Sequence, residues 1–328
     1  MIQWLQQLPK YWQNRNAITY LLWPFEVIYQ IAWYLRQVAI RLGFIQQHRV
    51  NATVIVVGNV VVGGGGKTPL TMALVQRLVK QGFRVGVVSR GYGRAQTSLQ
   101  IVNAHSLASE VGDEPLMIFQ KCNVPVVVGA QRVAAARQLL NQFPAVNVLV
   151  CDDGLQHIAL QRDIEICVMD ATGLGNGHLL PAGPLREPWP RQVDLLLHTH
   201  QRTLPEGFES RRELSSFALT SDGQQVPIAE LKLNPVEVVS GIAKPEAFLA
   251  MLKQGQFQIR HSTALPDHDH FQTWQPSHPE LPLLCTEKDA VKLWARFPQA
   301  LAMPLVFEPE PSFWKAFDQL FQSRHRYH

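Results

Sequence analysis

A run of four glycines, residues 63–66, is followed directly by Lys67 and Thr68. Glycines allow backbone N–H groups to close round a phosphate at the start of a helix, where the helix dipole also favours negative charge. Lys67 would neutralise charge on the β- and γ-phosphates of ATP, and the Thr68 hydroxyl would reach a bound Mg²⁺. The pattern therefore predicts nucleotide phosphate chemistry. The expected cofactor-binding residues are Val61, Val62, Gly63, Gly64, Gly65, Gly66, Lys67 and Thr68.

This loop departs from the usual spacing of phosphate-binding motifs. In G-x-x-x-x-G-K-[ST] the first glycine would stand at position 61, where this chain has Val61. A flexible glycine turn without a ligand is the alternative interpretation. The loop lies between a β-branched run over residues 53–57 and a helical pattern over 68–80, and that order favours phosphate binding.

Two carboxylates, Asp152 and Asp153, close the apolar run of residues 146–151. A phosphate-loop enzyme needs a carboxylate at the end of a buried strand to hold the metal ion or its water shell. These two residues and Thr68 are therefore the expected metal ligands. Which of the two carboxylates approaches the metal stays open, and the pair could instead cap the next helix.

Other polar segments follow expected strands. Residues 89–94 and 129–132 contain arginines, which can bind phosphate through two hydrogen bonds or remain solvated charges. Asp113 precedes an expected helix, so a helix cap and a catalytic role both stay open. The sequence Asp-His-Asp-His at 267–270 could suggest metal binding, but no second ligand cluster accompanies it, which disfavours a zinc site. The four scattered cysteines are expected to be reduced core thiols.

These side chains require an α/β scaffold to position them. Apolar runs at 84–88, 124–128, 146–151, 164–169 and 193–197 alternate with helical patterns, which predicts a mainly parallel, doubly wound sheet. Residues 205–235 are polar and are expected to form a linker with a possible hairpin at 222–223. The predicted organisation is an N-terminal segment over 1–49, a phosphate-loop domain over 50–204, this linker, and a smaller α/β domain over 236–328.

Composition limits the function classes. Of 328 residues, 46% are hydrophobic and 17% are charged, which is typical of a packed globular protein. The net charge of +4 resides in the first fifty residues, where five Lys or Arg accompany a single Glu, so the remainder is neutral. A general nucleic-acid-binding surface is therefore not expected.

The N-terminal segment is predicted to be an amphipathic helix with a bend at Pro24. Apolar residues recur at steps of three and four between Ile18 and Leu42, and half of the eight tryptophans lie in the first fifty residues. Glu26, Arg36 and Arg41 interrupt every apolar run long enough to span a bilayer. The helix could lie in a membrane interface, which Trp and Arg favour, or pack on the following domain as a core helix.

The ordered motifs resemble those of the tetraacyldisaccharide 4′-kinase family, the lipid A 4′-kinases of Gram-negative bacteria. The resemblance covers nearly the whole chain. Besides the glycine loop, the matching segments are V-G-N at 57–59, S-R-G-Y-G at 89–93, V-G-D-E-P at 111–115, D-D-G-L-Q-H at 152–157, L-L-P-A-G-P-L-R-E at 179–187, G-I-A at 241–243, D-H at 267–268 and T-E-K-D-A at 286–290.

The resemblance implies transfer of the ATP γ-phosphate to the 4′-hydroxyl of a tetraacyldisaccharide 1-phosphate, forming lipid IVA at the cytoplasmic face of the inner membrane. ATP and Mg²⁺ are the implied cofactors. The implied partners are the membrane-embedded glycolipid and the anionic inner-membrane surface, with neither nucleic acid nor an obligate protein partner. A substrate with acyl chains in the bilayer also favours the interfacial interpretation of the first helix.

The same resemblance implies roles for single residues. Asp113 would be the base that accepts the proton of the sugar hydroxyl, His268 would orient or tune it, and Lys67 would act in catalysis. His270 is the alternative to His268. Tyr92, Arg132 and Arg186 are further candidates for contacts to sugar or phosphate. The family commonly has a hydroxyl residue where Val61 and Gly65 stand here, which puts phosphate contacts by those two side chains in doubt.

Two rival functions use the same loop differently. A phosphate-loop GTPase or metallochaperone would need a guanine-reading N/T-K-x-D motif, and the sequence Thr-Glu-Lys-Asp at 286–289 only approaches it, because its Lys and Asp are adjacent. A membrane-docked ATP sensor without transfer activity is the second rival.

Overall fold

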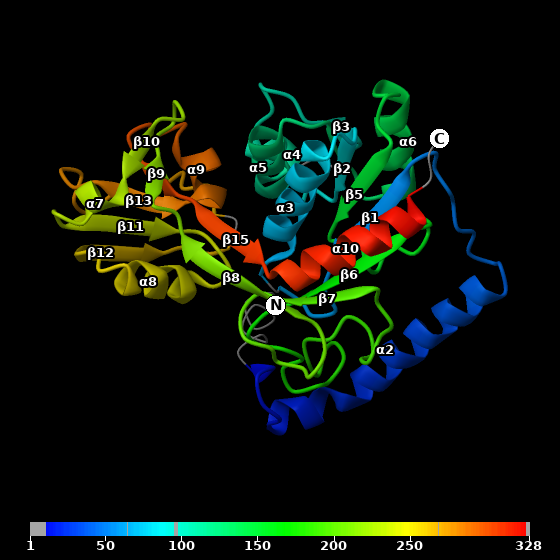
Figure 1. Cartoon of the computed structure of the whole chain (residues 1–328). Helices are drawn as coiled ribbons and strands as arrows, with labels where there is room; N and C mark the ends of the chain where they lie inside the picture. The colour runs from blue at the N-terminus through cyan, green and yellow to red at the C-terminus, as the bar shows by residue number, and fades with distance from the viewer. Residues whose placement is uncertain (1–10, 64, 95–97, 268, 326–328) are drawn as a thin grey trace. The chain divides into compact units, whose positions relative to one another are not determined.

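The computed structural model describes residues 11–63, 65–94, 98–267 and 269–325 (Figure 1). The chain forms two compact units. The first comprises the chain up to Arg90, Gln131–Ser210 and the chain from Pro309 onward; the second comprises Gly91–Ala130 and Arg211–Glu308. The expected domains followed one another in sequence, whereas these units are interleaved, because the chain passes from one to the other and back twice.

The first unit contains a parallel sheet with the strand order β8-β7-β6-β1-β5-β2. All six residues of β1 are buried, as expected for a strand covered on both faces. The mainly parallel α/β fold is confirmed. Its strands are β1 (Thr53–Gly58), β2 (Val85–Ser89), β5 (Val148–Asp152), β6 (Ile164–Met169), β7 (Leu195–His198) and β8 (Phe208–Leu214).

Strand β1 is the point at which the sheet changes direction. From β1 the chain crosses to β2 on one side and later returns through β6 and β7 on the other. Ligands bind at the carboxyl ends of strands at such a switch point. The register pairs Val57 of β1 with Asp152 of β5, so the β5 carboxylate lies beside the exit from β1.

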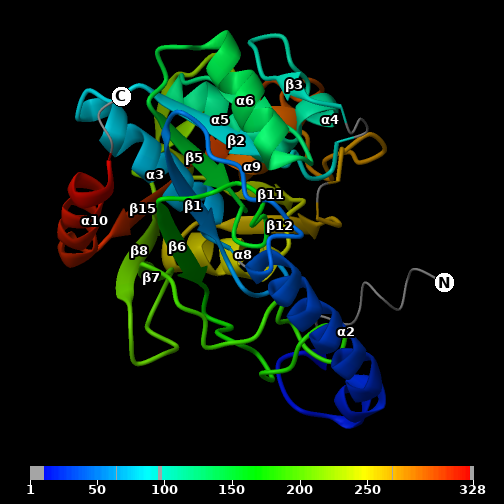
Figure 2. The same cartoon turned by 90° about the vertical axis from the view of Figure 1, so that its right-hand side faces the viewer.

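Helices cover both faces of this sheet. Figure 2 shows α3 and α10 on one side of strands β1 and β6 and α6 on the other. Phe313, Phe317 and Phe321 of α10 are buried at helical spacing, and the Arg77 guanidinium of α3 forms an ion pair with Asp318 of α10. The helices are α2 (Ala17–Arg41), α3 (Lys67–Lys80), α6 (Arg132–Gln142) and α10 (Pro311–Arg324).

The second unit has its own sheet with the strand order β10-β9-β14-β13-β11-β12. Strands β11 to β14 pair in parallel, whereas β9 pairs antiparallel with both of its neighbours. The strands of this sheet are β9 (Phe217–Leu219), β10 (Gln225–Pro227), β11 (Val236–Ser240), β12 (Ile259–Ala264), β13 (Leu283–Thr286) and β14 (Leu301–Met303). Outside it, β3 (Gln100–Ile101) pairs antiparallel with β4 (Val126–Val128), and β15 (Leu305–Pro309) ends at the crossing into the first unit.

The segment 205–235 is more ordered than a linker. Strands β9 and β10 pair antiparallel on either side of residues 222–223, and β8 and the short helix α7 also lie in this segment. Strands β9 and β10 have three residues each, and β8 is rich in charged residues, so their periodicity is weak in the sequence. The helices of the second unit are α4 (Ala108–Val111), α5 (Asp113–Cys122), α7 (Ile228–Leu231), α8 (Pro245–Gln254) and α9 (Glu287–Leu293).

Helix α2 begins at a capping box on Asn16 and continues through Pro24. In both views it lies along the loops that join β6 to β7 (Figures 1 and 2). Thr19 and Glu26 face these loops and are buried. The opposite face leaves large apolar side chains exposed, and they are Tyr20, Leu21, Trp23, Phe25, Ile28, Ile31, Tyr34 and Leu35. Within the described residues, no helix has the length and apolar character needed to cross a membrane.

Candidate active site

The glycine loop joins the carboxyl end of β1 to the start of α3. Gly66 has φ of +106°, and a Cβ atom there would lie 2.2 Å from Cγ2 of Thr199, so only glycine fits. Lys67 is the first residue of α3, and its ammonium donates a hydrogen bond to the Gly63 carbonyl at 2.9 Å. This strand, loop and helix have the order expected of a phosphate-binding site.

The first part of the loop is held by the segment 184–186. The Val62 N–H donates to the Pro184 carbonyl at 2.8 Å, and Val61 forms a bridge with Leu185. The backbone of both valines therefore fixes the loop against this segment, and their role in nucleotide binding stays a prediction. Farther along the loop, the Gly65 N–H donates a hydrogen bond to Asp170 Oδ2 at 3.2 Å. Gly64 lies outside the described residues.

Asp152 ends β5 and is buried beside the start of α3. Its carboxylate accepts hydrogen bonds from the Thr71 hydroxyl at 3.0 Å and from the Thr68 hydroxyl at 3.4 Å. Thr68 and Asp152, two of the expected metal ligands, therefore lie within hydrogen-bond distance of each other. A hydroxyl and a carboxylate at a phosphate loop are hard oxygen donors of the kind that Mg²⁺ prefers.

Asp153 adopts a left-handed conformation, with φ of 50°, and its carboxylate faces the loop. Oδ1 lies 3.8 Å from the Lys67 ammonium and accepts a hydrogen bond from Arg186 Nη1 at 3.0 Å. Burial alone would raise the pKa of Asp153, but the charges of Lys67 and Arg186 outweigh it and lower the pKa below its ordinary value. Asp153 is therefore an anion held between two cations.

Arg132 and His157 belong to the same region. Arg132 is buried at the start of α6, and burial lowers its pKa while Cys151, Asp152 and Asp153 oppose that shift. Burial, together with the charges of Arg132 and Arg90, lowers the pKa of His157 to about 4. The imidazole is therefore neutral at pH 7.

Asp113 belongs to the second unit, where it is the first residue of α5. The helix cap is Gly112, with no side-chain hydrogen bond, so the capping alternative for Asp113 is wrong. Its carboxylate is buried and lies 3.0 Å from the Lys292 ammonium. Lys292 also lies 3.6 Å from the buried Asp289, whose carboxylate accepts hydrogen bonds from the Gly241 N–H and the Thr286 hydroxyl.

The remaining predicted residues lie in different surroundings. Tyr92 is 65% exposed. His270 is exposed, whereas His268 lies outside the described residues. Among the described residues, no group of three His, Cys, Asp or Glu side chains could hold a metal ion. All four cysteines are thiols, and burial raises the pKa of Cys151 to about 11, so it is neutral at pH 7.

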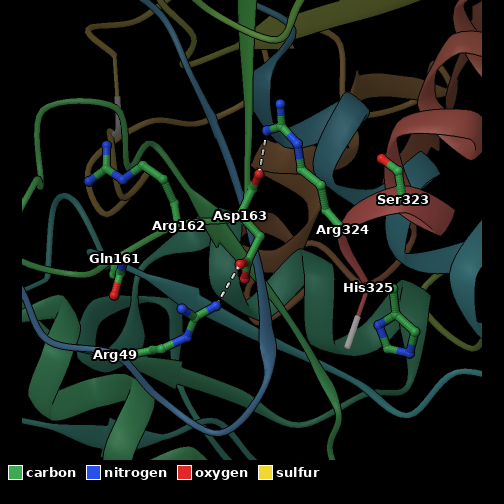
Figure 3. A pocket seen from close by; sticks show the side chains of 7 residues that line it. All are labelled: Arg49, Gln161, Arg162, Asp163, Ser323, Arg324 and His325. Carbon is green, nitrogen blue, oxygen red and sulfur yellow. Dashed lines mark hydrogen bonds and ion pairs between the residues drawn. The ribbon is translucent and has the colours of Figure 1, made fainter. Parts of the chain in front are cut away.

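A surface cavity of the first unit lies at the opposite ends of the strands (Figure 3). It surrounds Asp163, which precedes β6 and accepts a hydrogen bond from the Val54 N–H near the start of β1. Arg49 donates to the Asp163 carboxylate at 3.1 Å, whereas Arg324 donates to the Asp163 backbone carbonyl at 2.6 Å. The amino ends of β1 and β6 thus carry the ion pair of Arg49 with Asp163 together with hydrogen bonds, whereas the phosphate loop lies at the carboxyl end of β1.

Comparison with known proteins decides the family. The sequence profile described as tetraacyldisaccharide-1-P 4'-kinase (LpxK) matches residues 18–324. The chain belongs to this family.

Relatives within the LpxK family match almost end to end. A tetraacyldisaccharide 4'-kinase of Acidovorax sp. (strain JS42) is 48% identical over 313 residues, which is 94% of this chain and 92% of the relative. One of Polaromonas naphthalenivorans (strain CJ2) is 48% identical over 324 residues, covering 96% and 94%. A crystal structure of LpxK from Aquifex aeolicus in complex with ATP is 30% identical, has a TM-score of 0.83 and covers 94% of this chain and 100% of that chain.

The structure adds residues that the sequence analysis missed. Asp170 directly follows β6, just as Asp152 ends β5. An acidic residue at the carboxyl end of a predicted strand was the sequence signal that could have identified Asp170. Lys292, which pairs with Asp113, and Tyr29, whose hydroxyl donates to the Arg186 carbonyl at 2.6 Å, gave no such signal, because these partners lie far away in the sequence. Asp170, Lys292 and Tyr29 are therefore further candidate site residues of this LpxK family member.

Proposed function

We propose that this chain transfers the γ-phosphate of ATP to the 4′-hydroxyl of a tetraacyldisaccharide 1-phosphate, forming the 4′-phosphorylated lipid IVA. The observation on which this rests is the site at the carboxyl end of β1, where Lys67, Thr68 and two carboxylates meet. Family membership over residues 18–324 names the acceptor. The loop glycines 63–66, Lys67 and Thr68 are the groups that would surround the triphosphate.

The donor set fits magnesium. The Thr68 hydroxyl and the Asp152 carboxylate would hold Mg²⁺ directly or through its waters, and Asp153 would face Lys67 instead. When bound, the ion neutralises charge on the β- and γ-phosphates. We therefore propose that Asp152 binds the metal ion and that Asp153 orients the Lys67 ammonium.

Charge neutralisation is the main task of the remaining cations. Phosphoryl transfer depends chiefly on positioning and on stabilising the charge of the transferred group. Lys67 and Arg186 already flank Asp153, and Arg132 is buried in the same region. We assign Lys67 to the nucleotide phosphates and Arg132 and Arg186 to phosphate oxygens. Tyr92, which is exposed, is a candidate contact for the sugar.

Asp113 is proposed as the base. As the bond between the acceptor oxygen and phosphorus forms and the bond between phosphorus and the ADP oxygen breaks, the hydroxyl proton passes to the Asp113 carboxylate. Lys292 holds one oxygen of that carboxylate at 3.0 Å, which restricts its rotation. His268 remains the proposed partner of this base, with His270 as the alternative.

Helix α2 is proposed to lie in the interface of the inner membrane on its cytoplasmic face. Its exposed face carries Trp23 together with two Tyr, two Leu, two Ile and a Phe, which suits the boundary between head groups and acyl chains. Arg41 in the last turn of the same helix would be attracted to anionic lipid. A helix held there would bring the active site to a substrate whose acyl chains remain in the bilayer.

The GTPase alternative finds no support. In the segment Thr-Glu-Lys-Asp at 286–289, Thr286 caps α9 and Asp289 is fully buried, so both side chains serve the fold. The LpxK relatives likewise carry a kinase name.

The decisive experiment is transfer of labelled γ-phosphate from ATP to the purified lipid disaccharide. Asp113→Asn should keep ATP affinity within about twofold and lose at least about a hundredfold in kcat, the range of general base catalysis. Lys67→Ala should weaken both ATP binding and turnover. ATP hydrolysis without a labelled lipid product would instead support the sensor or switch. Near-normal transfer by Asp113→Asn would overturn the base assignment.

A further inference from the structure

The inner face of α2 is polar, unlike that of a helix that packs only through apolar contacts. The buried Glu26 carboxylate accepts a hydrogen bond from the Leu179 N–H at 2.7 Å and pairs with His178 Nδ1 at 2.7 Å. The Thr19 hydroxyl accepts a hydrogen bond from Asn176 at 3.3 Å. These contacts fix the position and rotation of the helix on the loops between β6 and β7.

Two more polar side chains of α2 reach farther toward the phosphate loop. The Tyr29 hydroxyl donates a hydrogen bond to the Arg186 carbonyl at 2.6 Å. Seven residues later, Arg36 Nη2 donates to the Gln156 carbonyl at 3.1 Å. Residues seven apart share one face of a helix, so α2 binds both segments with a single face.

Arg186 and Gln156, which accept hydrogen bonds from Tyr29 and Arg36, are direct neighbours of the phosphate loop. The Arg186 N–H donates to the Val60 carbonyl at 2.7 Å, while its guanidinium donates to Asp153 at 3.0 Å and approaches Gln156 Oε1 at 3.4 Å. The Gln156 amide donates to the Asn59 carbonyl at 2.9 Å. The path from Tyr29 to the Lys67 ammonium therefore runs through Arg186 and Asp153 alone.

Tyr29 is suited to this position chemically. Burial, aided by the charge of Glu187, raises the pKa of its hydroxyl, so the group stays neutral and able to donate. A backbone carbonyl can accept a hydrogen bond from any donor, but the position of that donor is set here by the helix. A shift of α2 would therefore move Arg186, the residue that holds the Asp153 carboxylate.

We propose that Tyr29 and Arg36 are positioning residues of the active site. Through them, α2 fixes Arg186 and Gln156 and thereby the Asp153 carboxylate beside Lys67. This inference rests on the proposed kinase function and goes beyond membrane attachment, because it makes α2 a structural part of the phosphate-binding site. Engagement of the outer face by lipid and alignment of the inner site are then coupled through one rigid helix.

The test compares Tyr29→Phe with Tyr11→Phe, a matched change at an exposed tyrosine that precedes α2. In mixed micelles of detergent and lipid disaccharide, Tyr29→Phe should lower kcat about fivefold to thirtyfold, the effect of losing one half-buried hydrogen bond to the site. Binding to phosphatidylglycerol vesicles and the thermal midpoint should stay close to those of Tyr11→Phe. Arg36→Met should also lower kcat, and Arg36→Lys, which keeps a donor, should restore most of it.

A second measurement separates this inference from the proposed function. Hydrogen exchange of the Val62 and Arg186 amides should be faster in Tyr29→Phe than in Tyr11→Phe, whether or not the lipid is phosphorylated. If the unsubstituted protein transfers no phosphate to the lipid, the proposed function fails and the exchange result still tests the positioning role. Equal kcat and equal exchange for the two tyrosine variants would overturn the inference.

Discussion

Neighbouring carboxylates can have opposite tasks, and Asp152 and Asp153 illustrate how the backbone separates them. Asp152 is the last residue of β5 and points into the hydroxyls of Thr68 and Thr71. Asp153 is turned by its left-handed conformation toward Lys67 and Arg186. The sequence predicted the pair but left open which one approaches a metal ion. The difference depends on one dihedral angle, which residue types alone do not encode.

Lys292 is predicted to be essential for the stability of the second unit. Its buried ammonium lies between Asp113 and Asp289, so Lys292→Met would remove the cation that forms an ion pair with both buried carboxylates. Removing one partner of a buried ion pair costs about 3–5 kcal/mol. Urea denaturation should show this loss.

A double variant tests whether the loss is electrostatic. Lys292→Met combined with Asp113→Asn should recover part of the free energy of unfolding, because one of the stranded charges is removed. If the losses of the two single variants simply add, the ion pair contributes no coupling and the prediction fails.

His157 should make stability depend on pH. Its pKa falls from 6.5 to about 4 on folding, so the unfolded state binds more protons between those values. Stability should therefore decrease as pH falls from about 6.5 toward about 4. Denaturation curves at several pH values in this window give the free energy of unfolding at each pH. That free energy should depend less steeply on pH in His157→Asn. A variant with an unchanged slope would exclude His157 as the titrating group.

At the scale of elements, strands in the middle of the sheet were predictable and edge elements were not. The run 164–169 was predicted as a strand and is β6, because a strand buried on both faces is a continuous apolar run. The strand β8 carries four charged residues and has a single buried residue, Ser210, and β3 has only two residues, so neither gives a clear pattern. The site elements were mostly predictable because they are central.

Helix α2 allows the membrane proposal to be tested without disturbing the active site. Ile28→Glu and Leu35→Glu change exposed apolar side chains on the outer face. Each should weaken binding to phosphatidylglycerol vesicles about tenfold or more, since burying such a side chain contributes about 1.5–3 kcal/mol. Vesicle sedimentation measures the effect.

Gln30→Glu is the matched control, because it adds the same charge at an exposed polar position of α2. A loss of binding equal to that of Ile28→Glu would mean that charge alone weakens attachment. That result would contradict burial of the outer face in lipid.

At the scale of the whole molecule, the two units are interleaved along the chain. Sequence patterns predicted consecutive domains because each local pattern reports its own element and none reports which sheet it joins. Residues 91–130 bring Asp113 into the second unit, and the C-terminal α10 returns to the first. Neither unit is therefore encoded by one continuous segment.

This connectivity predicts the effect of truncation. A chain that ends at residue 308 lacks α10, whose Phe313, Phe317 and Phe321 are buried in the first unit. It should lose cooperative thermal unfolding although the phosphate loop is intact. Phe317→Ala in the full chain should cost about 3–5 kcal/mol in urea denaturation, the range for a buried phenylalanine. Gln319→Ala, at an exposed position of the same helix, should be near neutral. Normal unfolding of the truncated chain would contradict the role of α10.

The two faces of α2 also have a calorimetric consequence. The inner face is joined to the protein by hydrogen bonds, whereas the outer face presents apolar surface to solvent. Transfer of that outer surface into lipid would lower the heat capacity of the system, and apolar burial weakens on cooling. Attachment to vesicles would therefore loosen in the cold and tighten on warming, and a chilled wash would release the protein more readily than a warm one.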